Sequence, residues 1–277
     1  MADSVTQKSA SLKTQLPVNT GYAMSVVTHI KYPVIGIALL LGFWWLGGYL
    51  IAQDPDLSAF SDFAPAATFS ALLGMIASGE LWPPIWASLG RIIAGLFWGI
   101  VIGVPLGVLV GYVKIALAVA NVPFQFLRMI SPLAWMPIAV LAFETWNSAI
   151  VFLIFMATVW PIIFSTAHGV RRIDPNWFKV ARNLGASAWQ MLQRIVMPAI
   201  MTDVLVGIRL AVGVAWVVLV PAEYLGVSSG LGYAINDARD TLSYDTLGAV
   251  VIVIGVIGYL LDLLCNELVK RFNWHIE

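Results

Sequence analysis

The 277-residue sequence has few charged residues and only one cysteine. Charged side chains make up 11% of the chain, whereas about a quarter of residues are charged in ordinary soluble domains. Together with a hydrophobic fraction of 60%, this composition excludes a water-soluble globular domain. The lone Cys265 excludes an internal disulfide, a cysteine zinc cluster and a dithiol redox pair, and no metal site is predicted. Fifteen basic and fifteen acidic residues cancel, so the total charge indicates no affinity for nucleic acid.

Long uncharged stretches predict six membrane-spanning helices. A span is a helix of roughly 20 apolar residues, because unpaired backbone groups are costly in hydrocarbon. Four such stretches stand out: residues 34–52, 92–113, 145–170 and 246–261. Two more contain a single arginine, Arg128 or Arg209: residues 115–143 and 204–222. The uncharged stretch 63–79 includes Pro65 and precedes two further prolines, so we expect a short interfacial helix there.

The placement of lysine and arginine predicts the orientation of these spans. Eleven basic residues fall on one side: Lys8, Lys13, Lys31, Lys114, Arg171, Arg172, Lys179, Arg182, Arg194, Lys270 and Arg271. Arg239 alone falls on the other side. Because cytoplasmic loops are rich in basic residues, both termini are predicted to be cytoplasmic.

The predicted spans divide the chain into five regions. The first apolar stretch is too long for a signal-peptide core, so we expect it to be retained as a span. The regions are a cytoplasmic tail (1–32), a first span (33–53), a periplasmic loop with the interfacial helix (54–85), a core of five spans (86–270) that includes a cytoplasmic loop (171–198), and a second cytoplasmic tail (271–277).

Glycine recurs at every fourth position of the second predicted span. The five residues are Gly95, Gly99, Gly103, Gly107 and Gly111. Such a ridge lets another helix approach its backbone closely. The partner helix could belong to the same chain, which we favour, or to a second subunit.

The cytoplasmic loop is predicted to contain two short helices. Trp177, Phe178, Ala181 and Leu184 recur at helical spacing near one face, and Gly185 suits the left-handed conformation that ends a helix. Pro198 is expected to mark the start of the fifth span. An apolar helical face with basic flanks could dock into a groove of another protein or rest on lipid headgroups, and the residues alone leave both open.

The spacing in this loop resembles the cytoplasmic signature of bacterial ABC importer permeases. That signature is Glu-Ala-Ala, three residues, Gly, nine residues, Ile, one residue and Leu-Pro. Here it reads Lys179, Val180, Ala181, Gly185, Ile195, Met197 and Pro198. Lys179 replaces the glutamate and Met197 the leucine. Segments 128–137 and 222–233 are similar to the nitrate, sulfonate and bicarbonate branch, and the likeness extends over about 86–271.

The resemblance implies an all-α membrane protein with the type I ABC importer permease fold, located in the bacterial inner membrane. Two permease copies, as a homodimer or with a close homologue, would enclose the pathway. Two ATPase subunits would bind the coupling residues, which are Trp177, Phe178, Lys179, Val180, Ala181, Leu184, Gly185, Ile195 and Pro198. A periplasmic or lipid-anchored solute-binding protein would deliver a small anion. Taurine or another sulfonate is favoured over nitrate, bicarbonate or an aromatic carboxylate.

The sequence contains no phosphate-binding Gly-x-x-x-x-Gly-Lys-Ser/Thr motif. We therefore expect no catalytic residue and no cofactor on this chain, with ATP and Mg bound by the partner ATPase. A secondary transporter is the alternative of a different class, but neither an internal repeat nor paired broken helices are evident.

Polar residues within the spans are candidates for the translocation pathway: Arg128, Ser131, Arg209 and Glu223. An arginine in a span costs about 2.5–3.5 kcal/mol on insertion scales, so it normally faces protein, water or a counter-ion. Arg128 and Arg209 could line an anion path, but we favour structural roles, bonded to helix-end carbonyls or to a carboxylate such as Glu223. Arg91 is predicted to extend from the outer end of its helix towards water.

Residues 226–230 formally match the Gly-x-Ser-x-Gly motif of serine hydrolases, with Ser228 as the nucleophile. The histidines His29, His168 and His275 all fall near the predicted cytoplasmic side, whereas Ser228 follows the fifth span on the outer side. A hydrolase is therefore not expected.

Overall fold

The computed structural model describes residues 20–272, with side chains from residue 31 onward except at 58 and 59. All regular structure within these residues is helical, which confirms the all-α prediction. Lys8, Lys13 and His275 lie outside the described residues. The chain forms two compact units, one ending at Pro65 and the other beginning at Ala66.

Five described helices are long and apolar enough to cross a membrane. They are α1 (Thr20–Gln53), α3 (Trp82–Tyr112), α6 (Trp146–Arg172), α9 (Met197–Gly226) and α11 (Tyr244–Phe272). Each coincides with one of the predicted spans. Helix α3 begins well before the predicted start at residue 92. Arg91 therefore lies within the helix and not at its end.

The first unit contains α1 and the 3-10 helix η1 (Pro55–Phe63). Asp54 begins η1, where its carboxylate accepts a hydrogen bond from the Asp56 amide at 3.0 Å. The Trp44 indole donates to the Phe63 carbonyl at 2.9 Å, which holds the end of η1 against α1.

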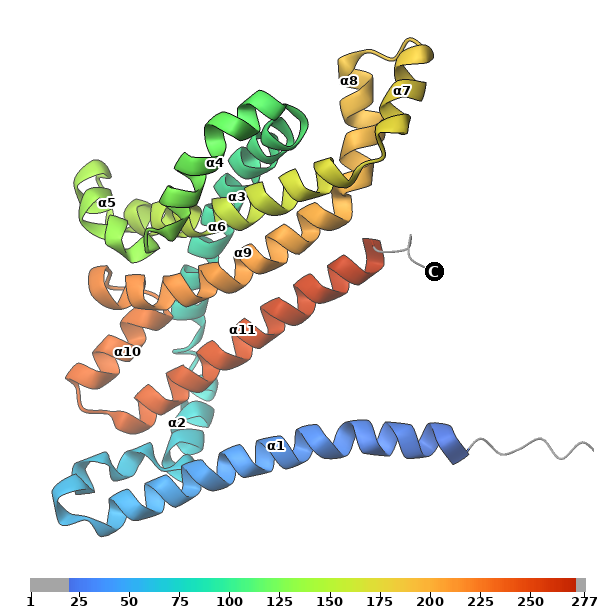
Figure 1. The fold of residues 1–277 in the computed structure, drawn as a ribbon. Helices are drawn as coiled ribbons and strands as arrows, with labels where there is room; N and C mark the ends of the chain where they lie inside the picture. Colours follow the sequence, from blue (N-terminus) through green and yellow to red (C-terminus); the bar gives the residue numbers. More distant parts are fainter. Residues whose placement is uncertain (1–19, 273–277) are drawn as a thin grey trace, which may run out of the picture. The chain divides into compact units, whose positions relative to one another are not determined.

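Helix α6 lies at the centre of the second unit, with α3 and α9 packed against it (Figure 1). Its inward face is almost fully buried, and the largest side chains there are Ile150, Leu153, Ile154, Ile162 and Ile163. Helix α11 packs on α9. The bundle therefore has two apolar clusters along α6, one around Leu153 and the other around Val170, and burying a charged side chain among them without a partner would be costly.

The glycine ridge of α3 contacts α6 of the same chain. A Cβ atom on Gly95 would lie 2.4 Å from the Ile154 side chain, and one on Gly107 would lie 2.6 Å from Thr166 Cβ and 2.8 Å from the Ile163 carbonyl. The residues that face the ridge also recur every four positions: Ile154, Thr158, Ile162, Thr166 and Val170. Because α6 occupies the ridge, it offers no free surface to a second subunit.

The stretch 115–143 is not one straight span, contrary to the prediction. It forms α4 (Lys114–Met129), the 3-10 turn η2 (Pro132–Trp135) and α5 (Met136–Ala142), with a bend of 89°. Ser131 precedes a proline and adopts an extended backbone (ψ 131°), because the ring of Pro132 disfavours the helical region before it. Helix α4 is about 24 Å long, short of the roughly 30 Å hydrocarbon core. The described residues therefore carry five spans, or six if the bent pair crosses as one.

The loop after α6 contains α7 (Pro175–Asn183) and α8 (Ala188–Met191), which confirms the two predicted helices. Helix α8 continues through the π-helical segment η3 (Leu192–Val196) into α9. Pro198 lies in the first turn of α9, as predicted, although the helical backbone runs without a break from α8 into α9. Proline lacks an amide and crowds the carbonyl four residues earlier, here that of Arg194, and the wider π turn accommodates this.

Two further helices lie in the second unit. Helix α2 (Pro65–Ser78) covers most of the stretch expected to form the interfacial helix. Its Thr68 is fully buried and packs closely on Gly248 of α11. Helix α10 (Leu231–Asp240) follows α9 and lies at the end of the core remote from α7 and α8 (Figure 1).

Candidate functional site

Local hydrogen bonds define where the short helices α7 and α8 begin. The Asp174 carboxylate accepts from the Asn176 amide at 2.8 Å and caps α7. Helix α8 begins with a capping box, in which the Ser187 hydroxyl accepts from the Gln190 amide and the Gln190 side chain accepts from the Ser187 amide. Both starts are therefore encoded in the local sequence.

The turn between α7 and α8 depends on Gly185, which has a φ of +74° as the sequence predicted. The Gly185 amide donates to the Arg182 carbonyl at 2.9 Å, and the Ala186 amide donates to the Ala181 carbonyl at 3.0 Å. This pair of bonds is a Schellman motif, which requires a left-handed residue at the glycine position. The turn fixes the angle at which the two helices meet.

The apolar residues of α7 divide between two faces, so the prediction of one common face is wrong. Phe178 packs inward on the cluster around Val170 and Ile173, with its ring edge-on to Tyr112 at 5.6 Å. Ala181 is buried beside it. The outward-facing residues are Trp177, Val180, Leu184 and Trp189, with exposed fractions of 55%, 58%, 81% and 64%. We call these four residues the α7–α8 apolar surface.

The remaining residues of the signature lie around this surface. Lys179 is exposed on α7, Ile195 is half-buried in η3, and Pro198 is exposed on the first turn of α9. Phe178 and Ala181 therefore attach α7 to its own bundle, while the α7–α8 apolar surface is presented to another molecule or phase.

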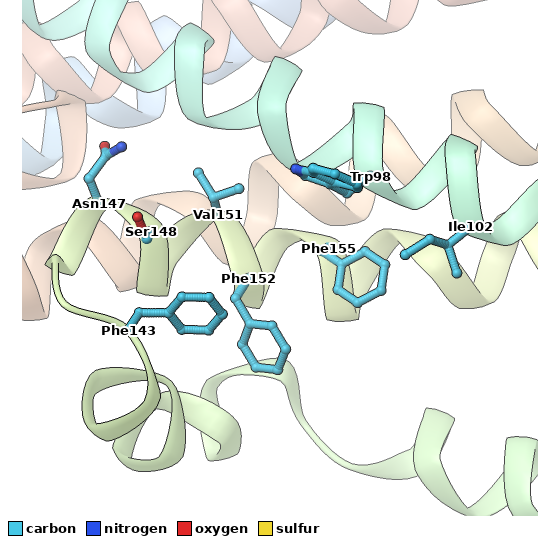
Figure 2. Close-up of a pocket in the computed structure, with 8 residues that line it drawn as sticks. All are labelled: Trp98, Ile102, Phe143, Asn147, Ser148, Val151, Phe152 and Phe155. Atoms are coloured by element: carbon cyan, nitrogen blue, oxygen red, sulfur yellow. The ribbon is translucent and has the colours of Figure 1, made fainter.

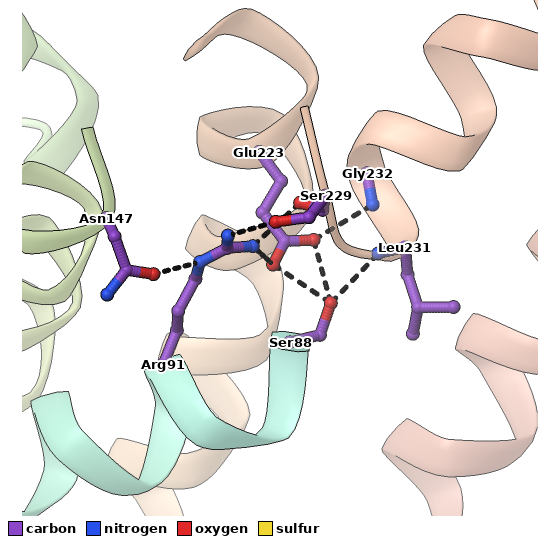
Figure 3. A network of polar contacts seen from close by, with 7 residues as sticks. All are labelled: Ser88, Arg91, Asn147, Glu223, Ser229, Leu231 and Gly232. Carbon is purple, nitrogen blue, oxygen red and sulfur yellow. Dashed lines mark hydrogen bonds and ion pairs between the residues drawn. The ribbon is translucent and has the colours of Figure 1, made fainter. Parts of the chain in front are cut away.

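A buried ion pair lies at the opposite end of the bundle (Figure 3). Arg91 of α3 donates from Nη1 to Glu223 Oε1 of α9 at 2.5 Å, and the two side chains are only 5% and 0% exposed. Arg91 also donates to the Asn147 side chain and to the carbonyl and hydroxyl of Ser229, each at 2.8 Å. The prediction that Arg91 extends towards water is therefore wrong, because a carboxylate inside the bundle neutralises it.

The same carboxylate holds the start of α10. Glu223 accepts from the Ser88 hydroxyl and from the Gly232 amide at 2.9 Å, and the Ser88 oxygen accepts from the Leu231 amide at 2.9 Å. Gly230 takes a φ of +108° to bring these amides round to the carboxylate. We call Ser88, Arg91, Asn147, Glu223 and Ser229 the polar clasp. It joins α3, α6, α9 and α10.

The polar clasp was not assembled by sequence reasoning. Arg91 and Glu223 are 132 residues apart, and the sequence analysis considered each of them without pairing the two. The available signal was the complementary charge of Arg91 and Glu223, each within a long and mainly apolar helix.

The structure does not bring the pathway candidates together. Arg209 bonds Asp262 at 2.9 Å and Asn266 at 2.9 Å on α11, so its carboxylate partner is not Glu223. Arg128 lies over the Phe164 ring at 4.9 Å. Ser131 lies at the break after α4. A structural pairing of Arg209 is thus observed, with a partner that the sequence analysis did not name.

Within the second unit, the described histidine His168 lies far from the Gly-x-Ser-x-Gly segment. Trp146, at the start of α6, lies against Gly226, whereas His168 lies about 33 Å further along the same helix. The neighbouring Ser229 binds Arg91. The segment serves the polar clasp and has no histidine partner among the described residues of the second unit.

Two cavities adjoin the polar clasp. The first, of about 620 Å³, is bordered by Arg91, Asn147, Ser228, Ser229 and Asn236 among others. The second, of about 370 Å³, has a mostly apolar wall, in which half of the residues are aromatic (Figure 2). Asn147 borders both.

These features define a multi-span helical membrane protein with a capped, outward-facing helical pair at one end. Residues 99–274 match the family described as "Binding-protein-dependent transport system inner membrane component". The chain belongs to this family. It is a permease subunit of an ABC importer and not an enzyme, which confirms the resemblance noted in the sequence.

Several relatives have named solutes. The chain is 40% identical to the bicarbonate transport system permease protein CmpB of Synechococcus elongatus, over 68% of each chain. It is 34% identical to the nitrate import permease protein NrtB of Leptolyngbya laminosa, over 70% of this chain and 69% of that one. It is 29% identical to the taurine transport system permease protein TauC of Escherichia coli, over 97% of this chain and 96% of that one.

Two solved transporters share the fold. A bacterial ABC transporter that imports the acidic polysaccharide alginate has a TM-score of 0.63 at 17% identity, over 90% of this chain and 99% of that one. The MetNI methionine ABC transporter in an inward-facing form has a TM-score of 0.56 at 16% identity, over 69% of this chain and 94% of that one. The type I importer permease fold is confirmed by these likenesses.

Proposed function

We propose that this chain is the permease subunit of an ATP-driven importer of a small anion, with taurine or another sulfonate as the substrate. Relatives named for bicarbonate, nitrate and taurine support an anion. The taurine permease aligns over 97% of this chain at 29% identity, whereas two bicarbonate permeases align over 68% and 83% at 40% and 33% identity, and the nitrate permease over 70% at 34% identity. Nitrate, bicarbonate and an aromatic carboxylate are the alternative substrates.

The observation that carries the coupling proposal is the α7–α8 apolar surface. Four large apolar side chains face outward on a pair of helices whose caps and turn are fixed by hydrogen bonds. A rigid pair of helices with an exposed apolar surface can dock into a groove of a partner protein. We assign the surface to the ATPase, which would bind ATP and Mg on its own chain, so that its closure moves α7 and α8 together.

The proposal places the α7–α8 end in the cytoplasm. The basic residues Arg171, Arg172, Lys179, Arg182 and Arg194 all belong to this end, as the positive-inside rule requires. The opposite end, with α10 and the polar clasp, then faces the periplasm and the solute-binding protein. Both chain termini are cytoplasmic if the bent pair α4–α5 counts as one crossing.

The full assembly would contain two permease copies, two ATPase subunits and one solute-binding protein in a lipid bilayer. A homodimer is proposed for the permeases.

Co-purification of the ATPase with the full-length chain tests the coupling proposal. Leu184→Asp places a charge in the α7–α8 apolar surface and should abolish association while the permease stays folded. Leu242→Asp is the matched control, because Leu242 is 67% exposed in the turn after α10, at the other end of the bundle. Retained association in Leu184→Asp would remove the docking proposal, and uptake that persists without any ATPase would favour a secondary transporter.

A further inference from the structure

The aromatic cavity between α3 and α6 has one polar end (Figure 2). Its wall consists mainly of apolar side chains: Trp98, Ile102, Phe143, Val151, Phe152 and Phe155. Asn147 and Ser148 lie together at one end, on the first turn of α6. At about 370 Å³, the cavity falls within the range of small-molecule sites. A cavity with an apolar wall and a polar end suits a molecule that has one polar head and an apolar body.

Arg91 determines which atoms of Asn147 are available. Arginine has only donors, so the atom of Asn147 that receives the Nε hydrogen at 2.8 Å must be the amide oxygen. The amide nitrogen then faces away from Arg91 (Figure 3). Among the described residues no acceptor bonds that nitrogen, and Asn147 is exposed at the wall between the two cavities. Two N–H donors are thus held ready for an acceptor.

The donors at this end carry no net charge. Glu223 neutralises Arg91, so the guanidinium orients Asn147 without adding a free cation to the cavity. The Ser148 hydroxyl shares a hydrogen bond with the Thr145 hydroxyl at 2.9 Å and remains at the cavity wall. Neutral donors suit a site that an anion must enter and leave, because a buried unpaired arginine would hold the anion much more strongly.

We propose that this cavity is a transit site for a small organic anion, whose oxyanion head accepts hydrogen bonds from Asn147 and whose hydrocarbon body lies against Trp98, Phe152 and Phe155. The inference rests on the proposed function and specifies its substrate class. The solute passes from the larger polar cavity to the aromatic one at Asn147. Arg91 is a positioning residue, since it acts through Asn147. Nitrate and bicarbonate lack a body that could fill the aromatic wall.

The test uses the complete importer in proteoliposomes, with its ATPase and solute-binding protein, and taurine, butanesulfonate, nitrate and bicarbonate as solutes. The quantity measured is the amount of solute imported per ATP hydrolysed. Asn147→Asp replaces the two donors with a carboxylate that repels anions, and should lower this ratio about tenfold or more, because a hydrogen bond to a charged group is lost. Stimulation of the ATPase by the solute-binding protein should stay at the wild-type level.

Phe152→Ala tests the aromatic wall. It should lower the ratio for butanesulfonate more than for taurine, because butanesulfonate has an uncharged four-carbon chain to lay against the wall, whereas the two-carbon body of taurine ends in an ammonium group. The controls are Asn121→Asp on α4 and Phe43→Ala on α1, which border neither cavity. Both should leave the ratio unchanged.

The outcomes separate this inference from the proposed function. If the wild-type importer moves no anion when ATP is supplied, the proposed function fails. If ATP drives uptake but Asn147→Asp keeps the wild-type ratio, the transit site is wrong and the importer stands. If nitrate or bicarbonate is imported best, the organic-anion class is wrong. If the two cavity variants change only the permease oligomer or its thermal stability, a second copy or lipid covers the cavity and the inference is overturned.

Discussion

The buried pair of Arg91 and Glu223 gives a sharp stability prediction. Glu223→Gln keeps the shape of the side chain but removes its charge, and so leaves the Arg91 guanidinium buried without a counter-ion. The carboxylate now accepts from Ser88, Arg91 and Gly232. An amide has only one oxygen for these donors, and its NH₂ group would face at least one of them.

The expected cost follows from burial. Removing one member of a buried, hydrogen-bonded ion pair costs about 3–5 kcal/mol, because the remaining charge is left uncompensated. Arg91→Met should cost a similar amount for the same reason. The double variant Arg91→Met/Glu223→Met should lose much less than the sum of the two single losses, since it leaves no unpaired charge.

Thermal unfolding of the full chain in detergent measures this effect. In domains of comparable size, 1 kcal/mol shifts the unfolding midpoint by about 2–4 °C, so each single variant should lose on the order of 10 °C. The control is Arg239→Met, whose arginine is 50% exposed and pairs with Asp240. An exposed pair contributes about 0–1 kcal/mol, so the control should lose only about 4 °C or less. Equal midpoints for wild type and both single variants, or a double variant that loses the full sum, would refute the reasoning.

Two further predictions concern glycines. Gly107→Ala should destabilise the chain by about 1–3 kcal/mol, because the new Cβ would lie 2.8 Å from the Ile163 carbonyl, and backbone cannot move aside as a flexible side chain can. Gly213→Ala, with nothing within 4 Å of the new Cβ, should be neutral or stabilising in the same thermal assay, and a lower midpoint for it would contradict this account. Gly185→Ala should strain the turn after α7 by about 1 kcal/mol and weaken ATPase association in graded detergent washes, with the unfolding midpoint of the bundle little changed. Undiminished association would show that the turn geometry does not matter for docking.

Much of the membrane architecture could be predicted from the sequence, because it depends on local patterns. Four of the five long helices followed from uncharged stretches and the fifth from an apolar stretch with a single arginine, and Gly185 followed from its place after an amphipathic segment. The break after α4 was also local, since Pro132 and Pro137 were visible, but the apolar character of the whole stretch favoured a single span. The sequence could not show which apolar residues of α7 pack on the bundle and which face outward. Helical spacing shows which residues lie near one another around the helix, but not which side of the helix meets the bundle.

Residue composition and spacing by themselves determined that this chain is a helical membrane protein, and the resemblance at 179–198 identified its family, because both depend only on neighbouring residues. Tertiary structure alone decided that Arg91 is buried, that its partner is Glu223, and that Asn147 turns its amide nitrogen towards a cavity. Such pairings join helices that are far apart along the chain, and the free energy of burying a charge depends on the partner that folding brings to it.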